Sequence, residues 1–142
     1  MACNGARVAA KLRCEIFPSD LDRTLRFYVE VLRFDVVKDE RQADSPYLAL
    51  CRDYVILGAA ARAAVAEPGT RRPPVGVELV LEVDDLDTER NHVMAAGWPF
   101  IEDLTSRPWG LRDFRLVDPD GYYWRITETR LTTDLARIMH QA

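Results

Sequence analysis

Charged and aromatic side chains that could hold a small molecule alternate with apolar residues in several short runs of the chain. Alternate residues of a β-strand share one face, so we expect each run to present these side chains together on one face of a sheet. The residues expected to line this face are Arg13, Glu15, Glu78, Glu82, Tyr123 and Arg125.

The chain offers few residues for catalysis. Its three cysteines show no C-x-x-C spacing, and no serine or cysteine has a base at a recognisable spacing. His92 is expected on a helix and His140 in the C-terminal tail, and neither has a partner at metal-ligand spacing. The remaining route to catalysis is a general base, Glu78 or Glu15, with a pKa raised by burial. These residue types favour binding over catalysis.

A short segment that occurs twice divides the chain into two similar halves. Ser19-Asp20-Leu21-Asp22 recurs 65 residues later as Asp84-Asp85-Leu86-Asp87, each time between an alternating run and an amphipathic run. A serine or aspartate at this place can cap a helix. The repeat therefore predicts two tandem modules of the same architecture, with the functional site where the two modules face each other.

Each half predicts the order strand, helix, strand, strand, strand. Module one, about 12–58, has expected strands at 12–17, 34–37, 47–51 and 54–57 and a helix that begins at Ser19 or Asp20. Module two, about 76–128, has expected strands at 77–83, 98–101, 113–117 and 122–127 and a helix over 85–96 that ends at Gly97. We expect one domain, 1–142, with a linker at about 59–75 and a tail or short helix at 129–142.

Three apolar residues are assigned to the interior from their spacing. Met94 is expected on the inward side of the second helix. Trp98 follows Gly97 at the junction of helix and strand, and is expected to pack against the core. Trp124 alternates away from the charged face and is expected on the helix-covered side of its strand.

Composition limits the partners. The chain has 142 residues, a formal charge of −4 and a pI near 5.2, which argues against a nucleic acid as partner, because that requires a net basic face. Residues 1–10 lack the apolar core of a secretory signal, and no stretch approaches the roughly 20 apolar residues of a membrane span. Cysteines without a disulfide pattern suit a reducing compartment. We therefore expect a cytoplasmic protein without nucleic-acid or membrane partners.

Two βαβββ modules with Asp-Leu helix starts resemble the vicinal oxygen chelate superfamily, which includes glyoxalase I, dioxygenases and the bleomycin resistance proteins. Further matching motifs are Phe27-Tyr28 in the first helix, Pro108-Trp109-Gly110, and the segment 114–121, which ends in Asp-Pro-Asp-Gly. The resemblance covers about 12–128. It implies an α+β fold with two tandem βαβββ modules that form a cupped mixed sheet, and a dimer.

The resemblance also assigns four positions at which the metal-dependent members carry ligands. In this sequence they fall at Arg13, Glu78, Arg125 and a residue near Ile56. Buried charges persist only when they are paired, so the resemblance implies that Arg13, Glu78 and Arg125 form a charge cluster there. Arginine stays protonated and has no lone pair to give a metal, so one carboxylate and two guanidiniums cannot make a metal site. We predict no metal and no cofactor.

The closer resemblance is to the bleomycin resistance proteins, in which planar rings of a drug stack between aromatic side chains in clefts between two subunits. Tyr47 and Trp109 match that pattern here. The implied function is a metal-free dimer that sequesters a planar aromatic antibiotic, such as a bleomycin-like glycopeptide, a quinone or an enediyne, and confers self-resistance. The alternatives are an enzyme of the superfamily that uses Glu78 or an atypical metal site, and a small-molecule carrier or sensor.

Overall fold

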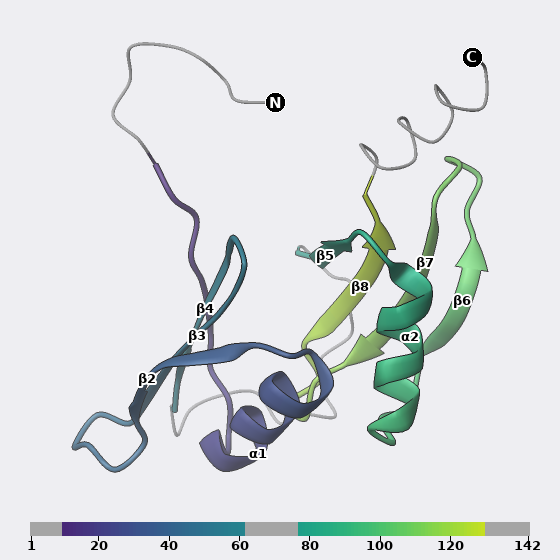
Figure 1. Cartoon of the computed structure of the whole chain (residues 1–142). Helices are drawn as coiled ribbons and strands as arrows, with labels where there is room; N and C mark the ends of the chain where they lie inside the picture. Colours follow the sequence, from purple (N-terminus) through teal and green to yellow (C-terminus); the bar gives the residue numbers. More distant parts are fainter. Residues whose placement is uncertain (1–9, 62–76, 130–142) are drawn as a thin grey trace.

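The computed structural model describes residues 10–61 and 77–129, which form two βαβββ modules in tandem (Figure 1). Module one contains β1 (Cys14–Ile16), α1 (Leu21–Arg26) continued by a π-helical turn η1 (Phe27–Val31), β2 (Asp35–Glu40), β3 (Tyr47–Arg52) and β4 (Val55–Ala60). Module two contains β5 (Leu79–Val83), α2 (Leu86–Ala95), β6 (Glu102–Ser106), β7 (Arg112–Val117) and β8 (Tyr123–Glu128). The predicted order of elements is confirmed. Most of the predicted linker and of the predicted C-terminal tail lies outside the described residues.

Each module builds its own four-stranded mixed sheet. The strand order is β1-β4-β3-β2 in module one and β5-β8-β7-β6 in module two. In both sheets the first strand pairs in parallel with the last, and the other neighbours are antiparallel. The two sheets therefore share one topology, as the sequence repeat predicted.

The repeated aspartates begin both helices. Oδ1 of Asp20 accepts hydrogen bonds from the backbone N–H groups of Asp22 and Arg23, at 2.9 and 3.2 Å. Oδ1 of Asp85 accepts one from the N–H of Thr88 at 3.0 Å. These caps satisfy N–H groups that have no partner within the helix, which explains why the segment marks a helix start in each module.

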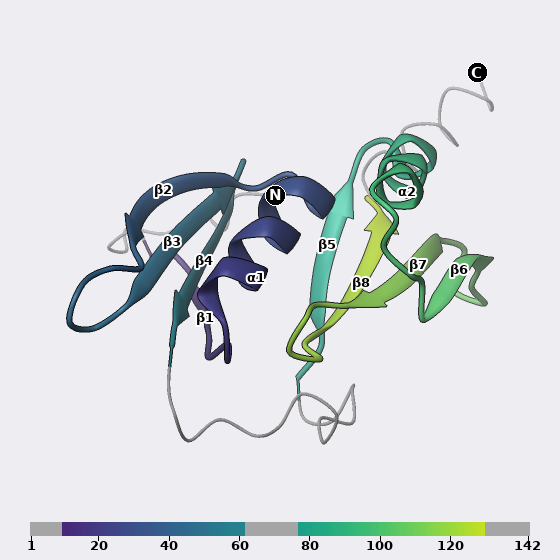
Figure 2. The same cartoon turned by 90° about the horizontal axis from the view of Figure 1, so that it is seen from below.

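α1 and η1 lie between the two sheets, where they join the modules (Figure 2). Tyr28 of η1 is fully buried; its hydroxyl donates to Oδ2 of Asp118 at 2.7 Å and accepts from Nε1 of Trp124 at 3.1 Å. The ring of Phe27 lies 4.8 Å from that of Trp98. The π-helical turn thus places two consecutive aromatic rings against module two, and the interior positions predicted for Trp98 and Trp124 are confirmed.

The inner faces of both sheets contribute to one hydrophobic core around α1 and η1. Ile16, Leu48 and Leu57 come from module one, and Leu116 and Ile126 from module two. Within residues 10–61 and 77–129, no helix covers the opposite face of either sheet, and each of these two open faces points away from the shared core. The expectation that the functional faces of the two modules face each other is therefore wrong within one chain.

A buried carboxylate joins α2 to module one. Glu89 is only 2% exposed, and its carboxylate accepts two hydrogen bonds from Arg52, at 2.7 and 2.9 Å, and one from Arg33 at 2.9 Å. Burial alone would raise the pKa of Glu89, but the two guanidiniums outweigh it and hold the pKa below its ordinary value. Met94, predicted to face inward from the same helix, is 50% exposed.

The predicted strand at 98–101 is wrong, because β6 begins only at Glu102. The indole Nε1 of Trp98 donates to the carbonyl of Val117 and the N–H of Ile101 donates to the carbonyl of Arg115, each at 2.8 Å, so hydrogen bonds tie this apolar segment to β7 although the strand pairing begins at Glu102. The strand itself is the polar run 102–106 at the edge of the sheet, which lacks apolar alternation. None of the described helices is long and apolar enough to cross a membrane.

Candidate functional site

The open face of the first sheet carries half-site A, which consists of Arg13, Glu15, Tyr47 and Gly58. Nε of Arg13 lies 2.7 Å from Oε1 of Glu15, and the hydroxyl of Tyr47 donates to the same oxygen at 2.9 Å. Burial and the hydrogen bond to Glu15 raise the pKa of Tyr47, so the hydroxyl remains a donor at neutral pH. Half-site A thus presents a guanidinium and a phenol ring fixed by one carboxylate.

Gly58 makes this arrangement sterically possible. It pairs with Glu15 of β1 on one side and with Ala49 of β3 on the other, in the middle of the sheet. A Cβ at position 58 would collide with the Glu15 carboxylate and the Tyr47 hydroxyl. A glycine inside a strand commonly marks such a close approach, a signal that sequence analysis could have used.

The strand registers identify the four positions that hold metal ligands in part of the superfamily. Cys14 pairs with Leu57, and its repeat equivalent Leu79 pairs with Trp124, so Gly58 and not Ile56 is the equivalent of Arg125. The four residues are then Arg13, Gly58, Glu78 and Arg125, which supply one carboxylate as the only donor group. This set does not fit a metal ion. Across the described parts of the chain, no group of three or more His, Cys, Asp or Glu side chains could hold one.

The open face of the second sheet carries half-site B, which consists of Glu78, Trp109 and Arg125 around a pocket of about 300 Å³. Nε of Arg125 lies 2.8 Å from Oε1 of Glu78, and the guanidinium carbon lies 5.9 Å from the centroid of the Trp109 ring. Trp109 is 47% exposed, which leaves much of its ring free to contact a ligand. The pocket is lined by Val80, Glu82, Trp109, Leu111, Arg125 and Thr127.

A tight turn between β6 and β7 holds Trp109 over this pocket. The N–H of Gly110 donates to the carbonyl of Arg107 at 3.0 Å, and the N–H of Arg107 donates to the carbonyl of Leu111 at 2.9 Å. Pro108 suits the second position of such a turn, and Gly110 adopts a φ of 90° that favours glycine. The guanidinium of Arg107 also binds Asp113 and Glu102, each at 2.8 Å. The base of the turn is therefore fixed on both sides.

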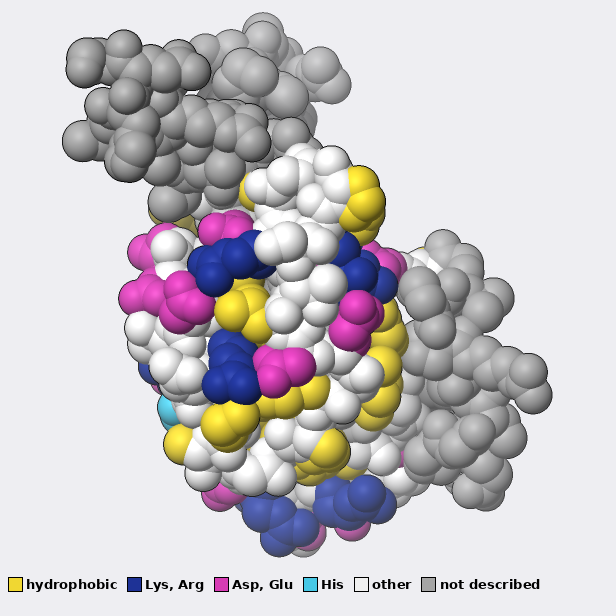
Figure 3. All heavy atoms as spheres, turned by 90° about the vertical axis from the view of Figure 1, so that its right-hand side faces the viewer, with side chains coloured by type: hydrophobic (Ala, Val, Ile, Leu, Met, Phe, Trp, Pro, Cys, Tyr) yellow, Lys and Arg dark blue, Asp and Glu magenta, His cyan; other side chains and the backbone are white. Residues whose placement is uncertain are grey.

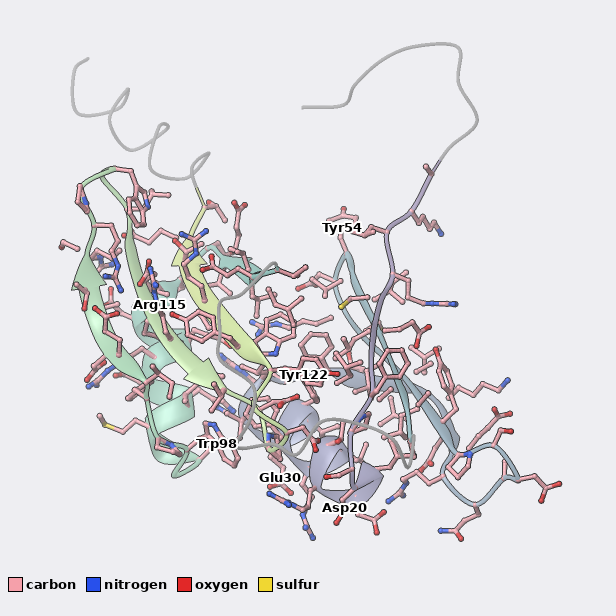
Figure 4. All side chains as sticks on the ribbon, turned by 180° about the vertical axis from the view of Figure 1, so that it is seen from behind. Asp20, Glu30, Tyr54, Trp98, Arg115 and Tyr122 are labelled. Atoms are coloured by element: carbon pink, nitrogen blue, oxygen red, sulfur yellow. The ribbon has the colours of Figure 1, made fainter. Side chains whose placement is uncertain are left out.

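Asp113 and Arg115 extend the polar network on this face, and sequence analysis did not select them. Arg115 projects from β7 (Figure 4), lies 3.3 Å from Asp113, and donates to the hydroxyl of Tyr123 at 3.0 Å. Burial would raise the pKa of Asp113, but Arg107 and Arg115 outweigh it and lower the pKa below its ordinary value. The alternation of Phe114 and Leu116 with these two charges is the signal that could have found them.

The predicted cluster of three charges is wrong within one chain. Arg125 meets Glu78 as expected, but Arg13 pairs with Glu15 on the other sheet. Tyr123 is buried beside Arg115 and does not line the pocket of half-site B. Tyr47 belongs to half-site A and Trp109 to half-site B, so the two aromatic residues also lie on different open faces.

Other contacts tie the two modules together next to these faces. Tyr122 lies between the modules (Figure 4), and its hydroxyl accepts a hydrogen bond from the N–H of Phe17 at 3.0 Å. On the side of β6 and α2, basic and acidic side chains lie next to each other with hydrophobic ones between them (Figure 3). Arg90 and Asp103, for example, pair at 2.7 Å. The described part of this side therefore offers no continuous basic surface of the kind that nucleic acids need.

Comparisons with known proteins agree on the fold. TioX from Micromonospora sp. ML1 aligns with a TM-score of 0.67 and 22% identity over 84% of this chain and 98% of TioX. UcmS2 aligns with a TM-score of 0.69 and 21% identity over 87% of this chain and 100% of its own. A bleomycin resistance determinant encoded on the transposon Tn5 aligns with a TM-score of 0.69 and 22% identity, over 86% of this chain and 99% of its own.

At these identities the solved structures show a shared fold and nothing about a shared ligand. No curated protein matches the sequence. The family model described as Glyoxalase/Bleomycin resistance protein/Dioxygenase superfamily matches residues 12–126, which is most of the chain. Together with the two βαβββ modules, this match shows that the chain belongs to the glyoxalase/bleomycin resistance protein/dioxygenase superfamily.

Proposed function

We propose that the chain is a metal-free binding protein that sequesters a planar aromatic antibiotic and so protects a cell, acting in the cytoplasm as a homodimer. The observation that carries the proposal is the half-exposed Trp109 on a fixed turn, beside the Arg125–Glu78 pair and above an open pocket. A flat ring system stacked on the indole gains about 0.5–1.5 kcal/mol beyond the burial of its area. Such a site gives affinity without chemistry.

The orientation of the half-sites supports a dimer. Each chain carries half-site A and half-site B on faces that point away from its own core, so the described residues of one chain enclose neither half-site. In the proposed dimer, half-site A of one chain faces half-site B of the other, and a ligand lies between Tyr47 and Trp109. Rings on both sides would then clamp the ligand and exclude water.

An enzyme with Glu15 or Glu78 as general base is the weaker candidate. Each of these carboxylates is already paired with an arginine, at 2.7 and 2.8 Å, and that guanidinium would compete with a substrate proton for the same oxygen. The fold-level similarity to a bleomycin resistance determinant agrees with binding, although a shared fold alone does not assign a ligand.

The test is a panel of planar antibiotics, including bleomycin, quinones and enediynes, with binding measured by isothermal titration calorimetry, which does not depend on the indole of Trp109. Trp109→Ala and Tyr47→Ala should each weaken binding at least about tenfold, because each removes one stacking ring. Tyr54→Ala is the matched control, since Tyr54 is fully exposed at the turn between β3 and β4. A ligand recovered unchanged supports sequestration. Stoichiometric bound metal with turnover of a substrate, or wild-type affinity in both site variants, would contradict it.

A further inference from the structure

Among the described arginines of the second open face, Arg125 is the one whose terminal donors remain available. Arg107, in the turn before β7, and Arg115, in β7, each bind two acceptors. The acceptors are Glu102 and Asp113 for Arg107, and Asp113 and Tyr123 for Arg115. Among the described residues, the terminal nitrogens of Arg125 have no hydrogen-bond partner.

Neighbouring groups hold the guanidinium of Arg125 in place but leave its terminal hydrogen-bond donors unpaired. Oε1 of Glu78 lies 2.8 Å from its Nε, but the N–H is not directed at that oxygen, and the buried Nε has no hydrogen-bond partner in the described chain. On another side the guanidinium lies over the ring of Trp109. A charge partner and a ring therefore restrain the group, while its outer edge, with the side chain 25% exposed, borders the pocket.

The free edge of a guanidinium is specific in what it binds. Its two terminal N–H donors are parallel and coplanar, so they match two acceptor oxygens held side by side in one plane. Val80 and Leu111 supply apolar pocket walls for a ring, and Trp109 supplies a stacking surface. Glu82 lines the same pocket and disfavours a second anionic group. A suitable ligand is flat, with one edge that carries two neighbouring oxygens.

The geometry points to Arg125 as the residue that selects the ligand: it binds a two-oxygen edge, an aromatic carboxylate or a vicinal dicarbonyl, of a planar molecule stacked on Trp109. The inference rests on the proposed function and names the chemical class of its ligand. An aromatic carboxylate and a vicinal dicarbonyl can each accept hydrogen bonds from the two terminal N–H donors of Arg125.

Pairs of probes of matched shape test this selection by isothermal titration calorimetry. Naphthalene-2-carboxylate is compared with naphthalene-2-carboxamide, and 9,10-phenanthrenequinone with its isomer 9,10-anthraquinone, whose oxygens are not neighbours. In one pair or both, we expect at least about tenfold tighter binding of the probe with two neighbouring oxygens, which is the carboxylate or the phenanthrenequinone, because charge-assisted bidentate contacts are strong. A carboxylate preference that weakens with salt identifies an acid, and a quinone preference that resists salt identifies a dicarbonyl.

Variants at Arg125 separate this role from stacking. Arg125→Gln should abolish the preference, and Arg125→Lys, which keeps the charge but loses the planar fork, should reduce it several-fold. Glu78→Gln should strengthen binding of the carboxylate, because it removes the competing negative charge. Arg26→Gln, on the exposed side of α1, carries the same change in net charge and should leave the preference unchanged. Thermal unfolding verifies that each variant is folded.

The outcomes distinguish the two proposals. Equal affinity within both probe pairs, or a preference that persists in Arg125→Gln, overturns the role of Arg125. If the probes still bind and Trp109→Ala weakens them, stacking at half-site B stands. Absence of binding to all four probes and to the antibiotic panel contradicts both the proposed function and this inference.

Discussion

Gly58 occupies in module one the place that Arg125 occupies in module two, so the two half-sites differ most at this pair of positions. A guanidinium enters the second open face at its centre, whereas the first open face is hollow there and accepts the side chains of Glu15 and Tyr47. The internal duplication has therefore produced one half-site that donates hydrogen bonds and one that supplies a ring tied to a carboxylate.

Gly58→Ala should disrupt half-site A. The added methyl group would displace Glu15 and Tyr47, so we expect ligand affinity to fall several-fold and the free energy of unfolding to fall by about 1–3 kcal/mol. Calorimetric titration and urea unfolding measure the two effects. Adding Tyr47→Phe removes one of the clashing atoms and should recover part of the lost stability, a coupling that two independent sites would not show. Unchanged affinity in Gly58→Ala would exclude half-site A from binding.

Among the described aspartates and glutamates with a shifted pKa, Asp118 is the one whose pKa is raised. Burial raises its pKa to about 6, although the hydroxyl of Tyr28 and two backbone N–H groups donate to it. The folded state therefore holds the proton more tightly than the unfolded chain, in which an aspartate has a pKa of about 3.9. The stability that this group contributes is fully present below about pH 4 and is lost as the pH rises through 6, by about 3 kcal/mol.

Asp118→Asn should abolish this loss. The free energy of unfolding of the variant minus that of wild type should increase by about 3 kcal/mol from pH 4 to pH 7, because only wild type loses this contribution. Urea unfolding at intervals of one pH unit measures the difference, with exposed Asp44→Asn as the control that should run parallel to wild type. A constant difference between Asp118→Asn and wild type over this range would show that Asp118 ionises normally.

At the scale of elements, α2 is joined to β3 and to the end of η1 by a single buried carboxylate. Glu89 accepts from Arg33, which follows η1, and from Arg52 at the end of β3, and Arg52 also donates to the carbonyl of Leu32 at 2.9 Å. The helix of module two is thereby fixed to module one by charge-assisted hydrogen bonds, which are stronger than neutral ones.

Glu89→Gln should lower the free energy of unfolding by about 1–3 kcal/mol at pH 7, because it leaves two guanidiniums with a weaker acceptor. The arginines lower the pKa of Glu89, so its contribution is present above the unfolded pKa of about 4.3 and is lost as the pH falls below that value. The difference in the free energy of unfolding between Glu89→Gln and wild type should therefore be smaller at pH 3 than at pH 7. Glu30→Gln, an exposed change of the same charge, should cost less than about 0.5 kcal/mol. A difference in the free energy of unfolding that does not depend on pH would contradict stabilisation by the ionised form of Glu89.

The elements that sequence analysis predicted correctly are those with local signals. Asp20 and Asp85 cap their helices through bonds to residues two or three positions away, so the sequence nearby is sufficient. The prediction of a strand at 98–101 was wrong because the indole of Trp98 is hydrogen-bonded to Val117, a contact that exists only in the folded sheet. The direction of the open faces could not be predicted, because it depends on the packing of Tyr28 against Trp124 between modules. The separation of Arg13 from Glu78 follows from that packing.

At the scale of the molecule, the position of α1 between the sheets determines how a binding site can be built. α1 packs against β3 and β4, α2 packs against β8, and Tyr28 of η1 packs against Trp124. Among the described residues the outer face of each sheet carries no helix (Figure 2), so the two half-sites lie on different open faces. A second copy can supply the missing half to each. A dimer built in this way has two clefts, and every chain contributes to both.

In the proposed dimer each cleft draws on two different chains, so two defective variants should complement each other. A mixed dimer of one Tyr47→Ala chain and one Trp109→Ala chain has one cleft that carries both substitutions and one that carries neither. Mixing the two variants under conditions of subunit exchange should restore tight binding at up to one ligand per mixed dimer. Tandem affinity tags would isolate that species for titration, and a mixed dimer without a tight site would show that a single chain forms its site alone. Because the helix separates the two sheets, a chain defective in one half-site could be complemented by a partner chain defective in the other.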